Sequence, residues 1–261
     1  MASTGESADQ VQLQTTMAYI ERFVQWVRAG QIDDKDLHRH RILVLLLDPH
    51  GDVPSRPRFF APYAPELPDP TADYVGREFV TGHLVHAAEW PQPVINYLTR
   101  YLRFIYLDLP NDQNPWELDM NSACGIEPEF DVYPCEHLWV SSQTNSSKPH
   151  LKFIHWSKQE SNDDALACSE LSYICRVICS YLPRRRFQSR MICPILVISL
   201  NGSRARVLEA YFDGERLVVR RTRPYDFADG DMGTFKTLAR WYLADAVGDT
   251  GQGALDRLDR I

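Results

Sequence analysis

Apolar residues recur at three- and four-residue steps in four parts of the chain, the spacing of a helix with one buried face. The helices expected from this pattern span residues 11–28, 91–107, 163–181 and 232–246. Gly30 follows the first segment and is a natural stop for it. Pro91 suits the first turn of the second segment, because the missing N–H is unpaired there in any helix.

Short runs of apolar and β-branched residues predict strands between these helices. They lie at residues 129–133, 137–141, 151–156, 192–200, 204–212 and 216–221. Asn201-Gly202 and Asp213-Gly214 separate the last three runs and are typical of two-residue hairpin turns, which favour positive φ. Residues 33–48 fit a short helix running into a strand, although their β-branched and Leu-rich core leaves this open. Six prolines in residues 51–70 exclude regular structure there and predict a long loop.

The order of these elements predicts an α/β (α+β) fold. We expect a mixed β-sheet with a C-terminal three-strand meander flanked by helices, preceded by a helical N-terminal segment. The expected organisation is a disordered leader at 1–10, a helical segment at 11–110, an α/β domain at 125–250 and a loose tail at 251–261. The Pro-rich loop lies within the helical segment, and the parts form one compact unit.

Composition narrows the class of protein. With 44% hydrophobic and 24% charged residues, the 261-residue chain has the balance of a globular protein. No apolar run approaches the roughly 20 residues that span a bilayer, so no membrane contact is expected. The first fifteen residues lack the features of a signal peptide. The six cysteines include no C-x-x-C pair, which favours free thiols in the cytosol or the nucleus.

Positive charge is concentrated in one block. Residues 183–223 hold ten arginines and three acidic residues, a balance of +7, whereas the whole chain carries −7. Such a block can bind the phosphates of nucleic acid, or it can pair with the acidic remainder of the chain. The candidate residues for binding nucleic acid or a protein partner are Arg184, Arg185, Arg186, Arg190 and Arg206.

The same region carries an ordered set of short motifs. In chain order they are Gln188-Ser189-Arg190, Ile195–Leu200 with Gly202, Ala205-Arg206-Val207, Asp213-Gly214, Leu217–Val219, Pro224-Tyr225-Asp226-Phe227 and the helix from Phe235 to Trp241. This set resembles the PD-(D/E)XK nuclease-like domain that lies upstream of the kinase domain in fungal-type protein kinases. The resemblance covers residues 125–250 and is best over 183–241. The chain lacks the Gly-rich loop and the V-A-I-K, H-R-D and D-F-G signatures of a kinase.

The resemblance implies a site for Mg²⁺. Nucleases of this fold hold the ion with carboxylates from two adjacent strands, and a lysine two residues after the second carboxylate helps to activate water. By this resemblance Glu129 and Asp131 are the metal ligands, and Asp131 and Lys158 are the catalytic residues.

The second strand of that site departs from the E-x-K pattern. Neither Trp156-Ser157-Lys158 nor His150-Leu151-Lys152 has a carboxylate two residues before its lysine. Glu160 or Glu136 could replace the missing ligand only from a different strand register. The incomplete pattern therefore favours a protein that is not an enzyme and needs no cofactor.

Three functions remain open at this point. The first is a non-catalytic nuclease-like binding or regulatory module that uses an Arg-rich face. The second is a Mg²⁺-dependent nuclease that uses Asp131 and Lys158. The third is an accessory protein of a fungal biosynthetic pathway, which a large apolar pocket would support.

Overall fold

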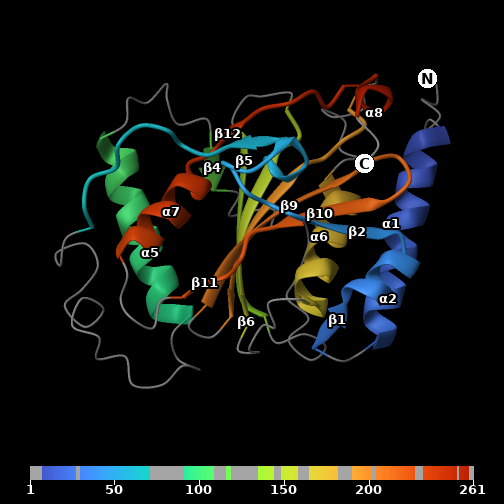
Figure 1. Ribbon diagram of the computed structural model, residues 1–261, viewed down its shortest axis with the longest axis horizontal. Coiled ribbons are helices and arrows are strands. Elements are labelled where there is room, and N and C mark those ends of the chain that lie inside the picture. Colours follow the sequence, from blue (N-terminus) through green and yellow to red (C-terminus); the bar gives the residue numbers. More distant parts are fainter. Residues whose placement is uncertain are drawn as a thin grey trace, which may run out of the picture.

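The computed structural model describes residues 8–27, 30–70, 91–108, 116–118, 135–143, 148–157, 165–181, 190–201, 204–226, 232–251 and 253–258. Within these ranges the chain forms a mixed β-sheet with helices on both faces (Figure 1). The fold class predicted from the sequence is confirmed.

The main sheet has eight described strands. Its order is β2-β10-β9-β8-β6-β5-β4, and β11 pairs with β9 outside this path. The strands are β2 (Ile42–Leu46), β4 (Trp116–Leu118), β5 (Cys135–Gln143), β6 (Leu151–Ser157), β8 (Ile195–Asn201), β9 (Arg204–Phe212), β10 (Leu217–Arg221) and β11 (Tyr225–Asp226). Two pairs are parallel, β2 with β10 and β6 with β8, and the other pairs are antiparallel.

The helices form two layers around this sheet. They are α1 (Ala8–Val27), α2 (Asp34–Arg39), α5 (Pro91–Asp108), α6 (Cys168–Tyr181), α7 (Met232–Tyr242) and α8 (Ala254–Arg257). Figure 1 shows α1, α2 and α6 on one side of the sheet and α5 with α7 on the other. Small strands complete the fold: β1 (Gln31–Asp33) pairs with β7 (Ala165–Ala167), and β12 (Asp245–Ala246) with β3 (Phe60–Ala61).

The meander strands carry side chains for two hydrophobic layers. On β9, Leu208, Ala210 and Phe212 pack in the layer with α1 and α6. Val207 and Tyr211 alternate with them and pack in the layer with α5 and α7. Each large apolar side chain buried in this way contributes about 1.5–3 kcal/mol. A strand covered on both faces reads as a continuous apolar run, which is the pattern that β8 has in the sequence.

The helices of the two layers follow their predicted stripes. In α1, Leu13, Met17, Ile20 and Val24 are buried, and Val27 packs at the edge of the same layer. In α5, the predicted inner residues are likewise buried: Val94, Ile95, Leu98, Leu102 and Ile105.

Several predicted boundaries were wrong. The segment expected as a helix from residue 163 forms strand β7 first, and α6 begins at Cys168. The last helix ends at Tyr242, and β12 follows it. The Pro-rich region contains a short 3₁₀ helix (Val53–Ser55) and β3. Ala254 and Leu258 are buried, so this part of the expected tail is packed and not loose.

The second hairpin of the meander also differs from its prediction. Phe212 pairs with Leu217, so residues 213–216 form a four-residue loop and not a two-residue turn. The Asp213 carboxylate accepts hydrogen bonds from the backbone N–H groups of Glu215 and Arg216, at 2.9 and 2.7 Å. Gly214 has φ of 100°, a conformation that favours glycine.

The N-terminal part of the chain is not a separate helical unit. Its strand β2 pairs with β10, and Leu37 and Ile42 belong to the same hydrophobic layer as α6. None of the helices in the described ranges is both long and apolar enough to cross a membrane.

Candidate functional site

Polar side chains gather where the parallel strands β6 and β8 end. His155 on β6 lies opposite Ser199 on β8, and Ser199 lies opposite Arg206 on β9. Direct cross-strand neighbours share one face of a sheet, so the three side chains form a row. This row faces α6, and each of its residues is buried.

The segments that carry the predicted catalytic residues join the sheet at this same end. Asp131 and Lys158 lie outside the described residues, but the strands next to them do not. Cys135 at the start of β5 lies opposite Ser157 at the end of β6. Asp131 precedes Cys135 by four residues, and Lys158 follows Ser157 directly. The other candidates of the metal site, Glu129 and Glu160, also lie outside the described residues.

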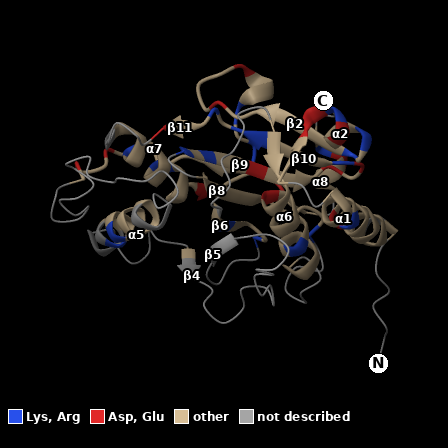
Figure 2. Cartoon of the chain, turned by 90° about the horizontal axis from the view of Figure 1, so that it is seen from below, with Lys and Arg blue, Asp and Glu red and all other residues tan. Residues whose placement is uncertain are grey.

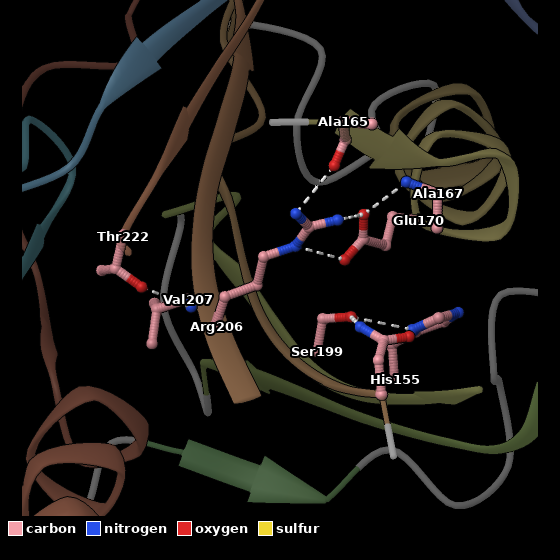
Figure 3. A network of polar contacts seen from close by, with 9 residues as sticks. His155, Ala165, Ala167, Glu170, Ser199, Arg206, Val207 and Thr222 are labelled. Atoms are coloured by element: carbon pink, nitrogen blue, oxygen red, sulfur yellow. Dashed lines mark hydrogen bonds and ion pairs between the residues drawn. The ribbon is translucent and has the colours of Figure 1, made fainter. Parts of the chain in front are cut away.

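An ion pair between Arg206 and Glu170 dominates the row (Figure 3). Arg206 Nε and Nη2 donate to the two carboxylate oxygens of Glu170, at 3.0 and 2.6 Å. Arg206 Nη1 donates to the carbonyl oxygen of Ala165, at 2.8 Å. The backbone N–H of Ala167 donates to Glu170 at 2.9 Å. One buried arginine of the sheet therefore holds β7 and the first turn of α6 in place.

Arg206 also determines the charge of Glu170. Burial alone would raise the pKa of this carboxyl, because the charged form loses its hydration. The charge and hydrogen bonds of Arg206, together with His155 and a hydrogen bond from Ser199, outweigh burial and lower the pKa below its usual value. The pair is therefore ionised, with a guanidinium bound to a carboxylate by two parallel bonds.

Ser199 connects this pair to the rest of the row. Its hydroxyl is one of the groups that lower the pKa of Glu170, and its oxygen also contacts two neighbouring side chains. Asn201 Nδ2 donates to that oxygen at 3.0 Å, and His155 Nδ1 lies 3.2 Å from it. The ring of His155 also lies 5.8 Å from that of Tyr173 in α6.

The burial and contacts of these side chains indicate that the row has a structural role. A serine, a histidine and a carboxylate also make up hydrolase triads, in which the histidine accepts the serine proton. Here Ser199, His155 and Glu170 are all 0% exposed. A nucleophile has to reach its substrate. The side chains of the row therefore connect the sheet to α6.

The opposite face of the sheet carries a second set of buried charges. Glu209 accepts hydrogen bonds from the backbone N–H groups of Arg58 and Phe59, at 2.9 and 3.2 Å. Arg220 lies opposite Glu209 in register, but its guanidinium donates to the carbonyl oxygens of Pro54 and Arg56. Burial raises the pKa of Glu209 to about 7, and the nearby donors and arginines only reduce this rise.

Lys152 belongs to this second face as well. Its ammonium donates to the carbonyl oxygen of Tyr242 and lies 3.6 Å from the ring centre of Trp116. Burial lowers its pKa well below the usual value. Lys152 was one of the two lysines considered for the E-x-K strand. Its side chain is 1% exposed and binds the C-terminal end of α7.

Close by on the same face, His150 contacts the segment after α7. One ring nitrogen, Nε2, lies 2.8 Å from the carbonyl oxygen of Val247, and the ring packs edge-on against Phe60. Burial lowers the pKa of His150 to about 4, so the ring is neutral near pH 7 and Nε2 carries the proton.

The structure corrects the prediction for Arg206. It was expected to contact a partner at the surface, but its side chain is 1% exposed and fully used by Glu170 and Ala165. Arg220 is buried in the same way. Figure 2 shows such charged positions in the centre of the sheet, between the helix layers.

Other arginines of the basic block are paired within the chain. The ion pairs are Arg204 with Asp226, Arg216 with Asp213 and Arg221 with Asp34. Arg190 is half-buried and forms a backbone bridge with Gly251. For Arg204, Arg216 and Arg221, pairing with acidic residues of the chain is the interpretation that the contacts support.

The three consecutive arginines, Arg184 to Arg186, lie outside the described residues. Their segment connects Tyr181, the last residue of α6, with Arg190 ahead of β8. Since α6 starts beside Arg206 and runs back along the sheet, the segment joins the end opposite to that of Cys135 and Ser157. The described residues nearest in sequence to the predicted catalytic pair, Cys135 and Ser157, and those that flank the arginine cluster, Tyr181 and Arg190, thus lie toward opposite ends of the sheet.

Sequence reasoning missed His155, Glu170 and Ser199. Each had a signal, because a polar residue inside an otherwise apolar strand or helix face has to find a buried partner. Ser199 in ICPILVISL and His155 in LKFIHWS are such residues. Their partners could not be named, since no motif links them.

Comparison with known proteins adds no relative: no protein-family model, no curated protein and no solved structure matches the chain. Within the described ranges, no three His, Cys, Asp or Glu side chains are grouped so that they could hold a metal ion. The resemblance to the nuclease-like domain remains a prediction from the residues.

Proposed function

We propose that this chain is a non-catalytic, nuclease-like binding module that contacts an anionic partner through the segment around Arg184, Arg185 and Arg186. The proposal rests on one observation: the buried ionisable side chains of the described sheet serve the fold. Lys152, His155 and Glu209 are buried and bonded to protein groups, so none is available to a substrate.

The choice of an anionic partner follows from charge. Arg206 and Arg220 are buried, whereas Arg184 to Arg186 are three adjacent cations in an otherwise acidic chain. Nucleic acid is the partner that such a cluster fits best, because guanidinium groups bind phosphates along a backbone. Arg190, at the end of the same segment, is a further candidate contact.

Binding of fluorescently labelled single-stranded DNA, duplex DNA and RNA, followed by anisotropy, tests this proposal. We expect binding at about 50 mM salt that weakens steeply toward about 200 mM, because phosphate contacts release counterions. Arg184/Arg185/Arg186→Glu should abolish it. Replacing the three arginines by Gln should reduce the slope of log Kd against log salt by about 3.

Arg100/Arg103→Glu is the matched control, since both arginines lie on the exposed side of α5. Its binding should stay within about threefold of the wild type. No binding at low salt, or equal loss in the control, would refute nucleic acid as the partner.

A second function, a Mg²⁺-dependent nuclease, is supported by the register of β5 and β6. The pairing of Cys135 with Ser157 attaches the segments of Asp131 and Lys158 to one end of two adjacent strands. Mg²⁺ prefers carboxylate oxygens and can activate water for attack on a phosphate. Here Asp131 and Glu129 would bind the ion, and Lys158 would help to activate the water.

Cleavage of labelled DNA and RNA with Mg²⁺, and with EDTA, tests this alternative. Asp131→Ala and Lys158→Ala should each abolish cleavage, while Lys148→Ala, at an exposed position ahead of β6, should retain it. Activity that survives Asp131→Ala belongs to another site or to a contaminant. The accessory role in a biosynthetic pathway stays a prediction, since no observation favours it.

A further inference from the structure

A surface groove lies between α1, α2 and the start of β2. Its volume is 390 Å³, and Thr15, Thr16, Tyr19, Arg39 and Arg41 line it. The lining contains two guanidinium groups and three hydroxyls, and none of these five residues is acidic. The Thr15 hydroxyl donates to the carbonyl oxygen of Val11 at 2.7 Å. The other four side chains are hydrogen-bond donors as well, and this is the composition of an anion site.

Arg41 has an unusual backbone for an arginine. Its φ is 61°, in the left-handed region, and it is the only described non-glycine residue with positive φ. It directly follows His40, the C-cap of α2, and its N–H donates to the carbonyl oxygen of His38 at 3.3 Å. Glycine is the usual residue where a helix ends in this way, because a Cβ is strained there.

The fold uses the backbone of Arg41 and not its side chain. Its carbonyl oxygen accepts a hydrogen bond from the N–H of Leu217, at 2.9 Å, where β10 begins beside β2. Its guanidinium is exposed and makes no hydrogen bond or ion pair with any residue in the described ranges. A glycine would suit this backbone conformation better, so the backbone alone does not account for an arginine at this position. Such a position points to a function for the side chain.

Two other residues of the lining, Tyr19 and Arg39, are held in place by neighbouring side chains. The hydroxyl of Tyr19 and Nδ1 of His40 lie 2.8 Å apart, and the His40 ring stacks on Phe23 with ring centres 3.5 Å apart. Arg39 is oriented by Asp36, with 3.2 Å between Nη1 and the carboxylate oxygen. The groove therefore presents an anchored phenol and an oriented guanidinium next to the unengaged one of Arg41.

We propose that this groove binds the phosphate group of a small phosphate monoester. Arg41 and Arg39 supply the charge, because a guanidinium binds two phosphate oxygens with parallel hydrogen bonds. Tyr19 and Thr16 supply hydroxyl groups beside them. The volume is that of a small-molecule site, large enough for a nucleoside monophosphate and too small for a folded partner. This inference is independent of nucleic-acid binding by Arg184 to Arg186.

Titration calorimetry with inorganic phosphate and with adenosine monophosphate tests the site, with chloride added to equal ionic strength as the reference. The deciding variant is Arg41→Gly, which removes the guanidinium and relieves the backbone. Its affinity for both probes should fall at least about tenfold, while its melting temperature should equal or exceed that of the wild type. Arg41→Lys should retain part of the affinity.

Arg223→Ala is the control, because Arg223 is another exposed arginine and lines a different groove. It should bind both probes like the wild type. Tighter binding of the nucleotide than of phosphate would identify an ester as the ligand, and equal binding would identify free phosphate. Three results would overturn the inference: no saturable binding of either probe, unchanged affinity in Arg41→Gly, or a lower melting temperature of that variant.

Discussion

The two faces of the sheet each bury one glutamate and one arginine, but they arrange them differently. On the α6 face, Arg206 binds Glu170 directly through two hydrogen bonds. On the α5–α7 face, Glu209 and Arg220 lie opposite each other in register, yet each bonds mainly to backbone groups. Both pairs are buried. The two faces therefore differ in the groups that bind each glutamate and not in its exposure to water.

The difference shows that burial alone does not decide whether a carboxyl is charged. For both glutamates the largest effect is burial, which raises the pKa. For Glu170, the contacts of Arg206, His155 and Ser199 more than offset it, and the pKa falls. For Glu209, the hydrogen bonds from two backbone N–H groups and the charge of Arg220, whose guanidinium bonds to carbonyl oxygens, offset only part of the effect of burial. The pKa of Glu209 therefore rises to about 7.

The largest expected effect is that of Arg206→Met at pH 7. It leaves the charged Glu170 buried beside Ala167 and Ser199 without its cation, which costs about 3–5 kcal/mol of unfolding free energy. Urea unfolding, followed by circular dichroism, measures the loss. The double variant Arg206→Met/Glu170→Gln should recover most of it, because no charge is then left unpaired. A double variant as unstable as the single one would mean that Arg206 acts by packing and not by charge.

The next effect is the pH dependence of Glu209. Its pKa is about 7 in the folded protein and near 4.5 when unfolded, so the folded state binds the proton more tightly. This contribution to stability is fully present below pH 4.5 and is lost as pH rises through 7. Relative to Glu209→Gln, the wild type should lose about 3 kcal/mol of unfolding free energy over this range.

Unfolding of the wild type and of Glu209→Gln in urea, at pH values from 4 to 8, gives the difference between them. Glu170→Gln provides the opposite reference. The pKa of Glu170 is lowered, so its contribution is present above its unfolded pKa and is lost as pH falls below about 4.5. If the difference for Glu209→Gln did not change with pH, the two faces would not differ as described.

The smallest expected effect concerns the arginine of the second face. Nη2 of Arg220 donates to the hydroxyl of Tyr211 at 3.2 Å, and Nη1 keeps its bonds to two carbonyl oxygens. Tyr211→Phe should therefore cost only about 1 kcal/mol in thermal or urea unfolding. The control is Tyr63→Phe, a half-buried tyrosine at the edge of the same layer, which should leave stability unchanged. A loss above about 3 kcal/mol would show that Tyr211 is the main partner of Arg220.

Local patterns were sufficient to predict the parts of the fold that local contacts decide. The bounds of β9 agree with the predicted run from Arg204 to Phe212, because its alternation and both flanking turns lie within a few residues. The stripe of α5 was predicted for the same reason. The strand β7 was missed because Ala165–Ala167 continues directly into α6, and its strand character comes from pairing with β1, far away in the chain.

The candidate site could be predicted only as isolated signals. Arg206 was recognised as one of a basic set, but burial and pairing depend on Glu170, 36 residues earlier, and on a helix start that the pattern placed elsewhere. The same holds for Lys152, whose partners Trp116 and Tyr242 come from two other elements. Contacts of this kind are set by how the sheet and helices pack, and no short motif encodes them.

The parallel pairing of β2 with β10 has a consequence for how the protein is made. Ile42 pairs with Leu217, and Leu46 with Arg221, so the partners are 175 residues apart. During synthesis β2 leaves the ribosome early, yet it has no strand to pair with until β10 has followed. Pairings between such distant segments form slowly and leave apolar strands exposed for longer. β2 is therefore among the first strands to be made and among the last to be paired.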